Sequence, residues 1–280
     1  MISINLYQAG IIDERIDFAE TWNELDLTEL HAISRVMLSD LQEEVTQKSI
    51  ILLELIKHRA AKKKIPVEVI QRIDPEDLTI SGLPLVDFIY ASNGLTRQPY
   101  TTIKVPADIS FMNRRFGMIG PKDDFQNLTC GEYEAAEIIF LQFKESNDAS
   151  LLASLAAVLY RKDAKEFISY NYRKSTYVTY DHEAYTKYFA RLDHHVLFTI
   201  FLWYNGCRSM LPVFFPTLHE GSDAGTKDLM VFTKCIHAAA GPKNGTRDQV
   251  RRSGLLPLFF EMEQEAKKAK ELQAEYDRRK

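Results

Sequence analysis

The sequence predicts a mainly α-helical protein, a multi-helix bundle with a small β or irregular element around residues 95–120. Apolar residues recur at helical spacing along several long stretches. Two segments also carry complete helix-start signals. Thr129 and Glu132 have the spacing of a capping box, in which each side chain bonds the other's backbone N–H, and Asp26 and Glu29 repeat it. We therefore expect helices to begin near residues 26 and 129.

The N-terminal part predicts a short strand and turn within residues 1–20, followed by two helices at 26–40 and 43–61. Pro66 blocks continuation of the second helix. Prolines and glycines then interrupt the pattern as far as Gly120, with room for a short helix at 83–91. Residues 100–105, YTTIKV, are rich in β-branched side chains and form the best strand candidate.

The central part predicts two helices, at 129–144 and 148–160, whose leucine-rich faces pack as an antiparallel pair. A long helix is expected from Asp181 to Met210. Within it, residues 196–207 are apolar and free of charge, but they are shorter than the roughly 20 residues that cross a membrane. We therefore expect a buried core helix and no membrane partner.

The C-terminal part predicts a helix at 227–239 and a last helix at 254–279. Beyond Phe260 the last helix has few apolar residues, so it projects into solvent or packs on a partner. These patterns divide the chain into an N-terminal helical region with an irregular linker (1–115), a central helical core (116–242) and a C-terminal projecting helix (243–280).

Composition narrows the class of protein. The 280 residues are 45% hydrophobic with a net charge of −4, which argues against disorder and against a general nucleic-acid coat protein. Acidic residues at Asp13 and Glu14 come too early for a secretory signal. The three cysteines are scattered, which is typical of a reducing compartment rather than a disulfide scaffold.

Candidate catalytic residues are few. A metal-dependent enzyme would use His194, His195, His219 and Glu220, and Cys207, Cys235 and His237 lie near them in sequence. The closely paired ligand spacing of zinc sites is missing, so we expect no metal and no cofactor. The segment 241–247, GPKNGTR, lacks the Lys-Ser/Thr ending of a phosphate-binding loop, and we expect a turn with Thr246 capping the next helix.

Tyrosines and basic residues alternate after residue 160, where seven of the thirteen tyrosines fall within 160–188. Tyrosine and arginine are enriched at protein interfaces, and the same pattern can stack bases in nucleic-acid proteins. The acidic overall charge favours the protein interface over nucleic acid. The candidate interface residues of this segment are Tyr170, Tyr172, Arg173, Lys174, Tyr177 and Tyr180.

Charge is distributed unevenly between the two ends. Residues 1–60 hold eleven acidic and five basic side chains, whereas residues 243–280 hold ten basic and seven acidic ones. Ends of opposite sign suit head-to-tail contacts that close into rings. We therefore expect a homo-oligomer and add Arg278 and Arg279 to the candidate interface.

The run GPKDDFQNLTCGEYEAAEIIFLQF, followed by SLAAVLYR, resembles poorly characterised proteins encoded by phages and prophages of Bacteroidetes, of the crAss-like phage type. ETWNELDLTEL at residues 20–30 is similar to their opening segment. The resemblance implies a non-enzymatic virion protein, a ring or connector subunit of the neck or tail, made in the host bacterial cytoplasm and bound to other virion proteins. It brings no catalytic residues. A tail assembly chaperone that is absent from the virion and a metal-dependent enzyme are the alternatives.

Overall fold

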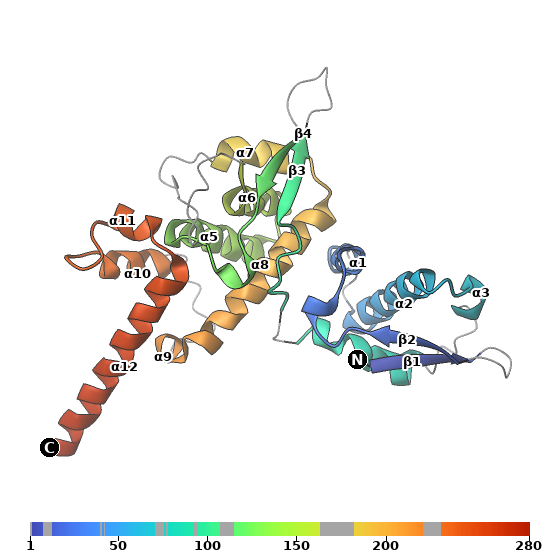
Figure 1. Ribbon diagram of the computed structural model, residues 1–280, viewed down its shortest axis with the longest axis horizontal. Coiled ribbons are helices and arrows are strands. Elements are labelled where there is room, and N and C mark those ends of the chain that lie inside the picture. Colours follow the sequence, from blue (N-terminus) through green and yellow to red (C-terminus); the bar gives the residue numbers. More distant parts are fainter. Residues whose placement is uncertain are drawn as a thin grey trace. The chain divides into compact units, whose positions relative to one another are not determined.

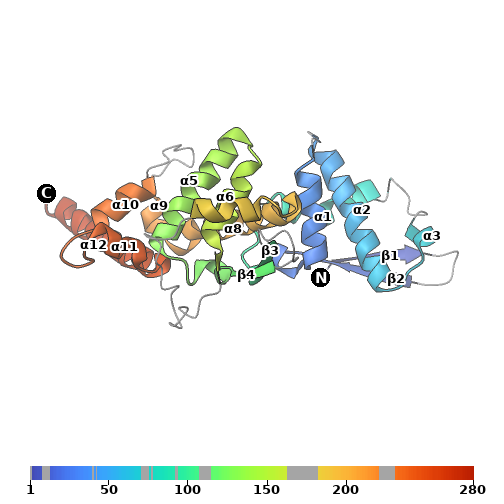
Figure 2. The ribbon, with the colours of Figure 1, turned by 90° about the horizontal axis from the view of Figure 1, so that it is seen from above.

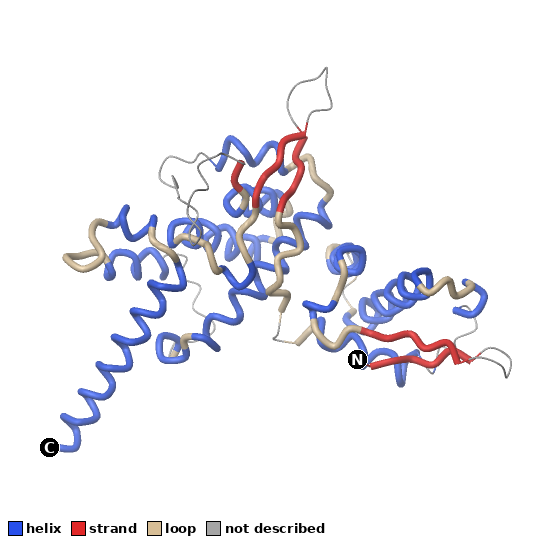
Figure 3. The backbone as a smooth tube through the Cα atoms, in the orientation of Figure 1, coloured by secondary structure: helices blue, strands red, loops and turns tan. Residues whose placement is uncertain are grey.

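The computed structural model describes residues 2–7, 13–39, 41, 43–70, 76, 78–91, 94–106, 115–162, 182–220 and 231–280. Helices dominate this part of the chain, which confirms the mainly α-helical, multi-helix class (Figure 3). The contacts divide the chain into two units, Met1–Pro99 with His194–Gly206, and Tyr100–Asp193 with Cys207–Lys280. This division differs from the three consecutive regions expected from the sequence, because helix α8 (His194–Phe214) contributes to both units.

The first unit begins with an antiparallel hairpin of β1 (Ile2–Tyr7) and β2 (Asp13–Phe18), in which Ile2 pairs with Phe18 and Tyr7 with Asp13 (Figure 1). Helices and helical turns follow it: η1 (Trp22–Glu24), α1 (Leu27–Met37), α2 (Glu44–Lys62), α3 (Val67–Ile70), the π-helical turn η2 (Leu78–Gly82) and the 3-10 helix η3 (Leu83–Ile89). The sequence predicts one strand within residues 1–20, and the structure forms two there; the residues between them lie outside the described part of the chain. The helices predicted at 26–40 and 43–61 are present as α1 and α2.

The core of the first unit forms between α1, α2 and the first part of α8. Helices α1 and α2 lie side by side in both views (Figures 1 and 2). The hydroxyls of Ser34 and Thr199 share a buried hydrogen bond of 2.8 Å between α1 and α8. Trp203 is fully buried and its indole N–H donates to the carbonyl of Thr96 at 2.9 Å. This bond fixes the segment after η3 against α8.

Within its described residues, the second unit contains three antiparallel strands in the sheet order β3 (Thr102–Pro106), β4 (Arg115–Ile119), β5 (Arg161–Lys162). The predicted strand at 100–105 is therefore confirmed as β3, and β4 falls within the small β or irregular element predicted around residues 95–120. The sequence pattern did not predict β5. Buried Ile103 and Val105 alternate along β3 with exposed residues, as expected for a strand with one face on the core.

Helices α5 (Cys130–Ser146) and α6 (Ser150–Leu159) form the predicted pair and pack on each other. Thr129 caps α5, and the capping box with Glu132 is present. Asn147 ends α5 in the left-handed conformation (φ 55°), which asparagine tolerates better than most residues. Asp26 and Glu29 likewise form the expected box on α1.

The single helix expected from Asp181 to Met210 is wrong. The chain forms α7 (His182–Phe189) and α8 instead. Asp193 is extended (φ −60°, ψ 137°) at the position before α8, and its side chain makes no capping hydrogen bond there. The apolar spacing runs on from Phe189 to Leu197, both buried, so periodicity alone could not show the break.

Among its described residues, the second unit also contains α9 (Pro216–His219), α10 (Val231–Ala239), α11 (Arg247–Arg252) and α12 (Leu255–Arg279). A two-sided backbone bridge joins Thr129 to Gly254, so α5 and α12 begin next to each other. Thr246 caps α11 through a third capping box with Gln249, as expected for the segment GPKNGTR. Among the described helices, none combines the length and the hydrophobicity that a transmembrane span requires.

Candidate interaction site

The histidines considered as metal ligands fall in different units. His194 and His195 begin α8 in the first unit, where the His195 ring lies 4.6 Å from that of His31. His219 ends α9 in the second unit, and its Nδ1 lies 2.9 Å from the carbonyl of Phe215. Glu220 follows it and pairs with Lys270. His195, His219 and Glu220 therefore each contact a different group.

The thiols near these histidines are held in their protonated form. Burial raises the pKa of Cys207 well above its usual value, and that of Cys235 less strongly. The third cysteine, Cys130, is also buried, which raises its pKa to about 11 despite a hydrogen bond with Ser253. A thiolate is the form that attacks substrates and binds metals, so these environments oppose both chemistries.

Within the described residues, Asp26, Glu29 and His58 are the one group of three side chains whose atoms approach closely enough to hold a metal ion. Its carboxylates already have partners. Arg59 donates to both oxygens of Glu29, and Lys62 pairs with Asp26, whose other oxygen accepts from the helix N-terminus. The charges of Asp26 and Glu29 are neutralised by those of Lys62 and Arg59. These ion pairs therefore link α1 to α2.

Burial alone would raise the pKa of Asp26. Hydrogen bonds from Lys62, from the Glu29 backbone and from His58 outweigh it and hold the pKa well below its usual value. Arg59 also donates to the carbonyl of Asp17, and its guanidinium lies over the Phe18 ring. The same arginine therefore joins β2, α1 and α2.

Helix α5 carries three buried acidic residues, each paired with an arginine from another element. Glu132 is fully buried and lies 3.1 Å from Arg161 of β5. Glu137 accepts from Arg208 of α8 at 2.8 and 2.9 Å. The third, Glu134, accepts from Arg251 of α11 at 2.7 and 3.1 Å and from Thr233 of α10 at 2.7 Å.

These pairs give α5 a structural role at the centre of the second unit. Buried charges persist where they are paired and hydrogen-bonded. Arg161 begins the tyrosine-rich, basic stretch that the sequence analysis interprets as a protein interface, but Arg161 is buried against Glu132. Tyr160, just before it, is fully buried, and its hydroxyl donates to the carbonyl of Tyr100 at 2.9 Å. The beginning of that stretch therefore belongs to the core.

The other candidate residues of that stretch, Tyr170, Tyr172, Arg173, Lys174, Tyr177 and Tyr180, lie outside the described residues. The remaining candidates, Arg278 and Arg279, lie in the last turn of α12. Arg279 pairs with Glu275 one turn back, and both side chains are more than half exposed. Of the candidate interface residues, only those in α12 can therefore be examined in the structure.

Helix α12 has an anchored first part and an exposed second part. Phe259 packs in an aromatic cluster with Tyr133, Phe215 and Phe232, at ring separations of 5.4 to 6.1 Å. Every residue from Lys267 to Lys280 is exposed. Figure 1 shows this second part extending away from α10 and α11 towards the C-terminus.

Glu263 marks the end of the anchored part. It is 2% exposed, and its carboxylate accepts from the backbone N–H groups of Thr217 and Leu218 at the start of α9 and pairs with Lys267 at 3.2 Å. Burial alone would raise the pKa of Glu263, but these bonds outweigh it and lower the pKa to about 2. Glu263 therefore fixes α12 at α9.

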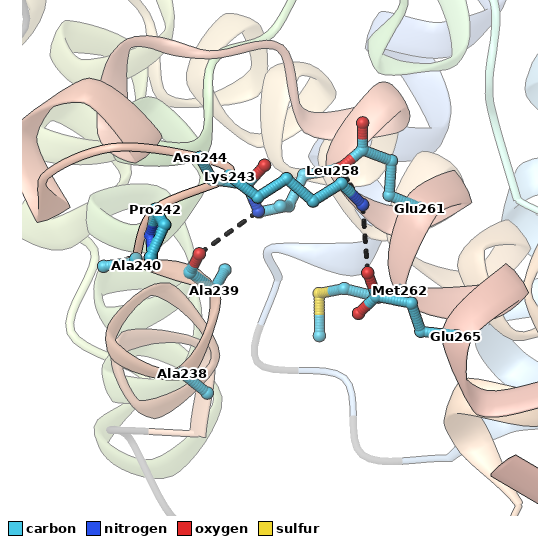
Figure 4. A pocket seen from close by; sticks show the side chains of 11 residues that line it. Ala238, Ala239, Ala240, Pro242, Lys243, Asn244, Leu258, Glu261, Met262 and Glu265 are labelled. Carbon is cyan, nitrogen blue, oxygen red and sulfur yellow. Dashed lines mark hydrogen bonds and ion pairs between the residues drawn. The ribbon is translucent and has the colours of Figure 1, made fainter.

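A pocket of about 330 Å³ lies between the end of α10, the turn after it and the first part of α12 (Figure 4). Leu258 and Met262 give it an apolar side. Lys243 reaches across it, with Nζ 3.3 Å from Glu261 and 3.0 Å from Glu265. These hydrogen bonds raise the pKa of Lys243. The pocket thus combines apolar surface with two carboxylates that share one lysine.

The pocket was not predicted, because Lys243 and the two glutamates are about twenty residues apart in sequence. The Lys-Asn-Gly-Thr turn gave a partial signal. Gly245 adopts φ +78° there, which glycine allows, and Asn244 donates to the carbonyl of Ala239 at 3.1 Å. The turn thereby brings Lys243 back towards α12. Comparison of the chain with protein-family models, curated proteins and solved structures finds no significant match.

Proposed function

We propose that this chain is a non-enzymatic structural protein of a phage particle, a subunit of a ring or connector in the neck or tail. The resemblance of residues 120–161 and 20–30 to phage and prophage proteins of Bacteroidetes supports the virion assignment. The proposed partners are further copies of the chain and other virion proteins, and the chain would be made in the host bacterial cytoplasm.

The observation that carries the proposal is the exposed second part of α12. Leu272 is 67% exposed and Tyr276 is 57% exposed, one helical turn apart. A helix with so little burial gains little stability from its own unit and is suited to contacts with another chain. Aromatic and arginine side chains, which α12 presents in its last turns, are enriched where proteins meet.

Protein composition of purified particles tests the proposal. Quantitative mass spectrometry of phage particles from a producing host should find this chain at a fixed copy number relative to the other neck and tail proteins. The particles are compared before and after a second gradient purification, which removes loosely attached protein. A copy number that survives purification supports a structural subunit.

The alternative role gives a different result. A tail assembly chaperone would be absent from the particle but would co-purify with tail proteins from the infected cell. If the chain neither occurs in particles nor binds any virion protein in the lysate, the proposal is overturned.

A further inference from the structure

We propose that the last turns of α12 of one copy dock into the α10–α12 pocket of a second copy, which builds a head-to-tail assembly. This inference rests on the proposed function, since it names the contact through which a ring of this chain would form. Both partners of the contact, the pocket and the last turns of α12, belong to the second unit.

The pocket is suited to a cation with an apolar neighbour. Glu261 and Glu265 share the single Lys243, which leaves a surplus of one negative charge. The carboxyl end of α10, which closes the pocket at Ala239, adds the partial negative charge of a helix C-terminus. Leu258 and Met262 supply apolar surface beside these charges.

The last turns of α12 carry the complementary features on one face. Leu272, Tyr276 and Arg279 follow each other at spacings of four and three residues, which places them on the same side of the helix. Lys280 adds a second cation and lies over the Tyr276 ring at 4.7 Å. Arg278 is one residue away and therefore points about 100° from Arg279 around the helix axis.

The ion pairs of the pocket are weak enough for an incoming arginine to compete with Lys243 for the carboxylates. The side chains of Lys243, Glu261 and Glu265 are 61%, 45% and 65% exposed, so their pairs are surface pairs that contribute little to stability. An arginine can join or replace Lys243 there, because its planar guanidinium bonds a carboxylate through two N–H groups at once. The side chains of Arg279 and Glu275 are 76% and 56% exposed, so their ion pair is a surface pair as well.

The helix prevents a copy from filling its own pocket. The pocket lies beside residues 258–265 of α12, and Arg279 lies roughly 25 Å further along the same helix at 1.5 Å per residue. The contact must therefore join different copies, and the two surfaces involved are different. Such heterologous contacts close into rings when the rotation allows it and form fibres when it does not.

Analytical ultracentrifugation of the full chain across a concentration series tests the contact. Arg279→Glu and Glu265→Arg should each shift the association midpoint to at least tenfold higher concentration. Arg278→Glu is the matched control, because it makes the same charge change in the same last turn on a different face, and it should shift the midpoint less than threefold. Combining Arg279→Glu with Glu265→Arg in one chain should restore association.

Three results would overturn the inference. The first is an equal shift of the association midpoint by Arg279→Glu and Arg278→Glu. The second is a combined variant that fails to associate although its helix content by circular dichroism matches the wild type, and the third is a wild-type chain that is monomeric at every concentration. None of these results decides whether the chain occurs in phage particles, so the proposed function is judged separately by particle composition.

Discussion

Gly94 and Gly206 are packed backbone to backbone. A Cβ atom added at Gly94 would lie 2.4 Å from the Cα of Gly206, and one added at Gly206 would lie 2.2 Å from the carbonyl oxygen of Leu95. The segment that follows Gly94 is held there by Asn23, whose amide oxygen accepts from the backbone N–H groups of Thr96 and Arg97. Two glycines distant in sequence therefore allow this segment to cross α8 in direct contact.

Gly206→Ala should destabilise the protein. Replacing glycine with alanine within a helix usually stabilises a protein by about 1 kcal/mol. A loss of stability in Gly206→Ala would therefore come from the clash of the new Cβ atom with the segment after Gly94. We expect a loss of about 2 kcal/mol or more in the free energy of unfolding, measured by urea denaturation. Gly241→Ala is the control, because an added Cβ there meets nothing within 4 Å. Equal stability of the two variants would contradict the close packing.

Arg251→Ala should cost about 3 kcal/mol of the free energy of unfolding, because it leaves the carboxylate of Glu134 buried without its cation. Adding Glu134→Gln to that variant should recover part of the loss, since the buried charge is then removed. The control is Glu271→Gln on the exposed part of α12, which should change stability by less than about 0.5 kcal/mol. A double variant less stable than Arg251→Ala would argue against this account.

Stability should fall in acid through Glu263. Its pKa is about 2 in the folded protein against an ordinary value of 4.5, so the charged carboxylate stabilises the fold fully above about pH 4.5. That contribution is lost as the pH falls from 4.5 towards 2. Urea midpoints measured from pH 6 to pH 2 should show a steeper fall for the wild type than for Glu263→Gln, which should already be less stable at pH 6. Parallel curves would show that Glu263 does not carry this pH dependence.

Under the proposed contact through α12, reversing Arg278 and Arg279 together should weaken association of the chain while the fold stays intact, because both lie in the exposed last turn of α12. Light scattering should give a lower mass for this variant at equal concentration, with unchanged far-ultraviolet circular dichroism. Lys268→Glu, a charge reversal at another exposed position of α12, serves as the comparison. Unchanged assembly would remove the last turn of α12 from the interface.

The three cysteines should differ in their reaction with a thiol reagent at pH 8. Cys235 is half-buried and should react first in the folded protein, slowly because burial raises its pKa. Cys130 and Cys207 are buried and should react only as the protein unfolds, which a denaturant series followed by absorbance would detect. Rapid reaction of all three in the native protein would contradict the described burial.

The helix starts were predictable because a capping box is local. Thr129 with Glu132 and Asp26 with Glu29 involve residues three apart, and the chemistry of those residues alone specifies the bonds. The break before α8 was not predictable, since Asp193 interrupts a stretch whose apolar spacing continues on both sides. Local signals therefore located most helices but not their exact limits.

Pairings between distant residues explain the larger omissions. Glu134 meets Arg251 across 117 positions, and nothing in either residue's neighbourhood specifies that partner. Arg161 is a second example. Its neighbours in sequence are basic and tyrosine-rich, which is typical of an interface, but in the fold Arg161 is buried against Glu132. Of the candidate site, the exposure of α12 followed from its polar composition, whereas the pocket beside it required the three-dimensional turn at Gly245.

The membership of α8 in both units has a consequence for synthesis on the ribosome. Thr199 and Trp203 complete the core around α1 and the segment near Thr96, yet they are translated about a hundred residues after Pro99. The part of the first unit in residues 1–99 therefore cannot complete its core until His194–Gly206 has been translated, and its apolar surface stays exposed until then. Closing so long a loop slows folding, and a chaperone would have its clearest opportunity to bind the nascent chain in that interval.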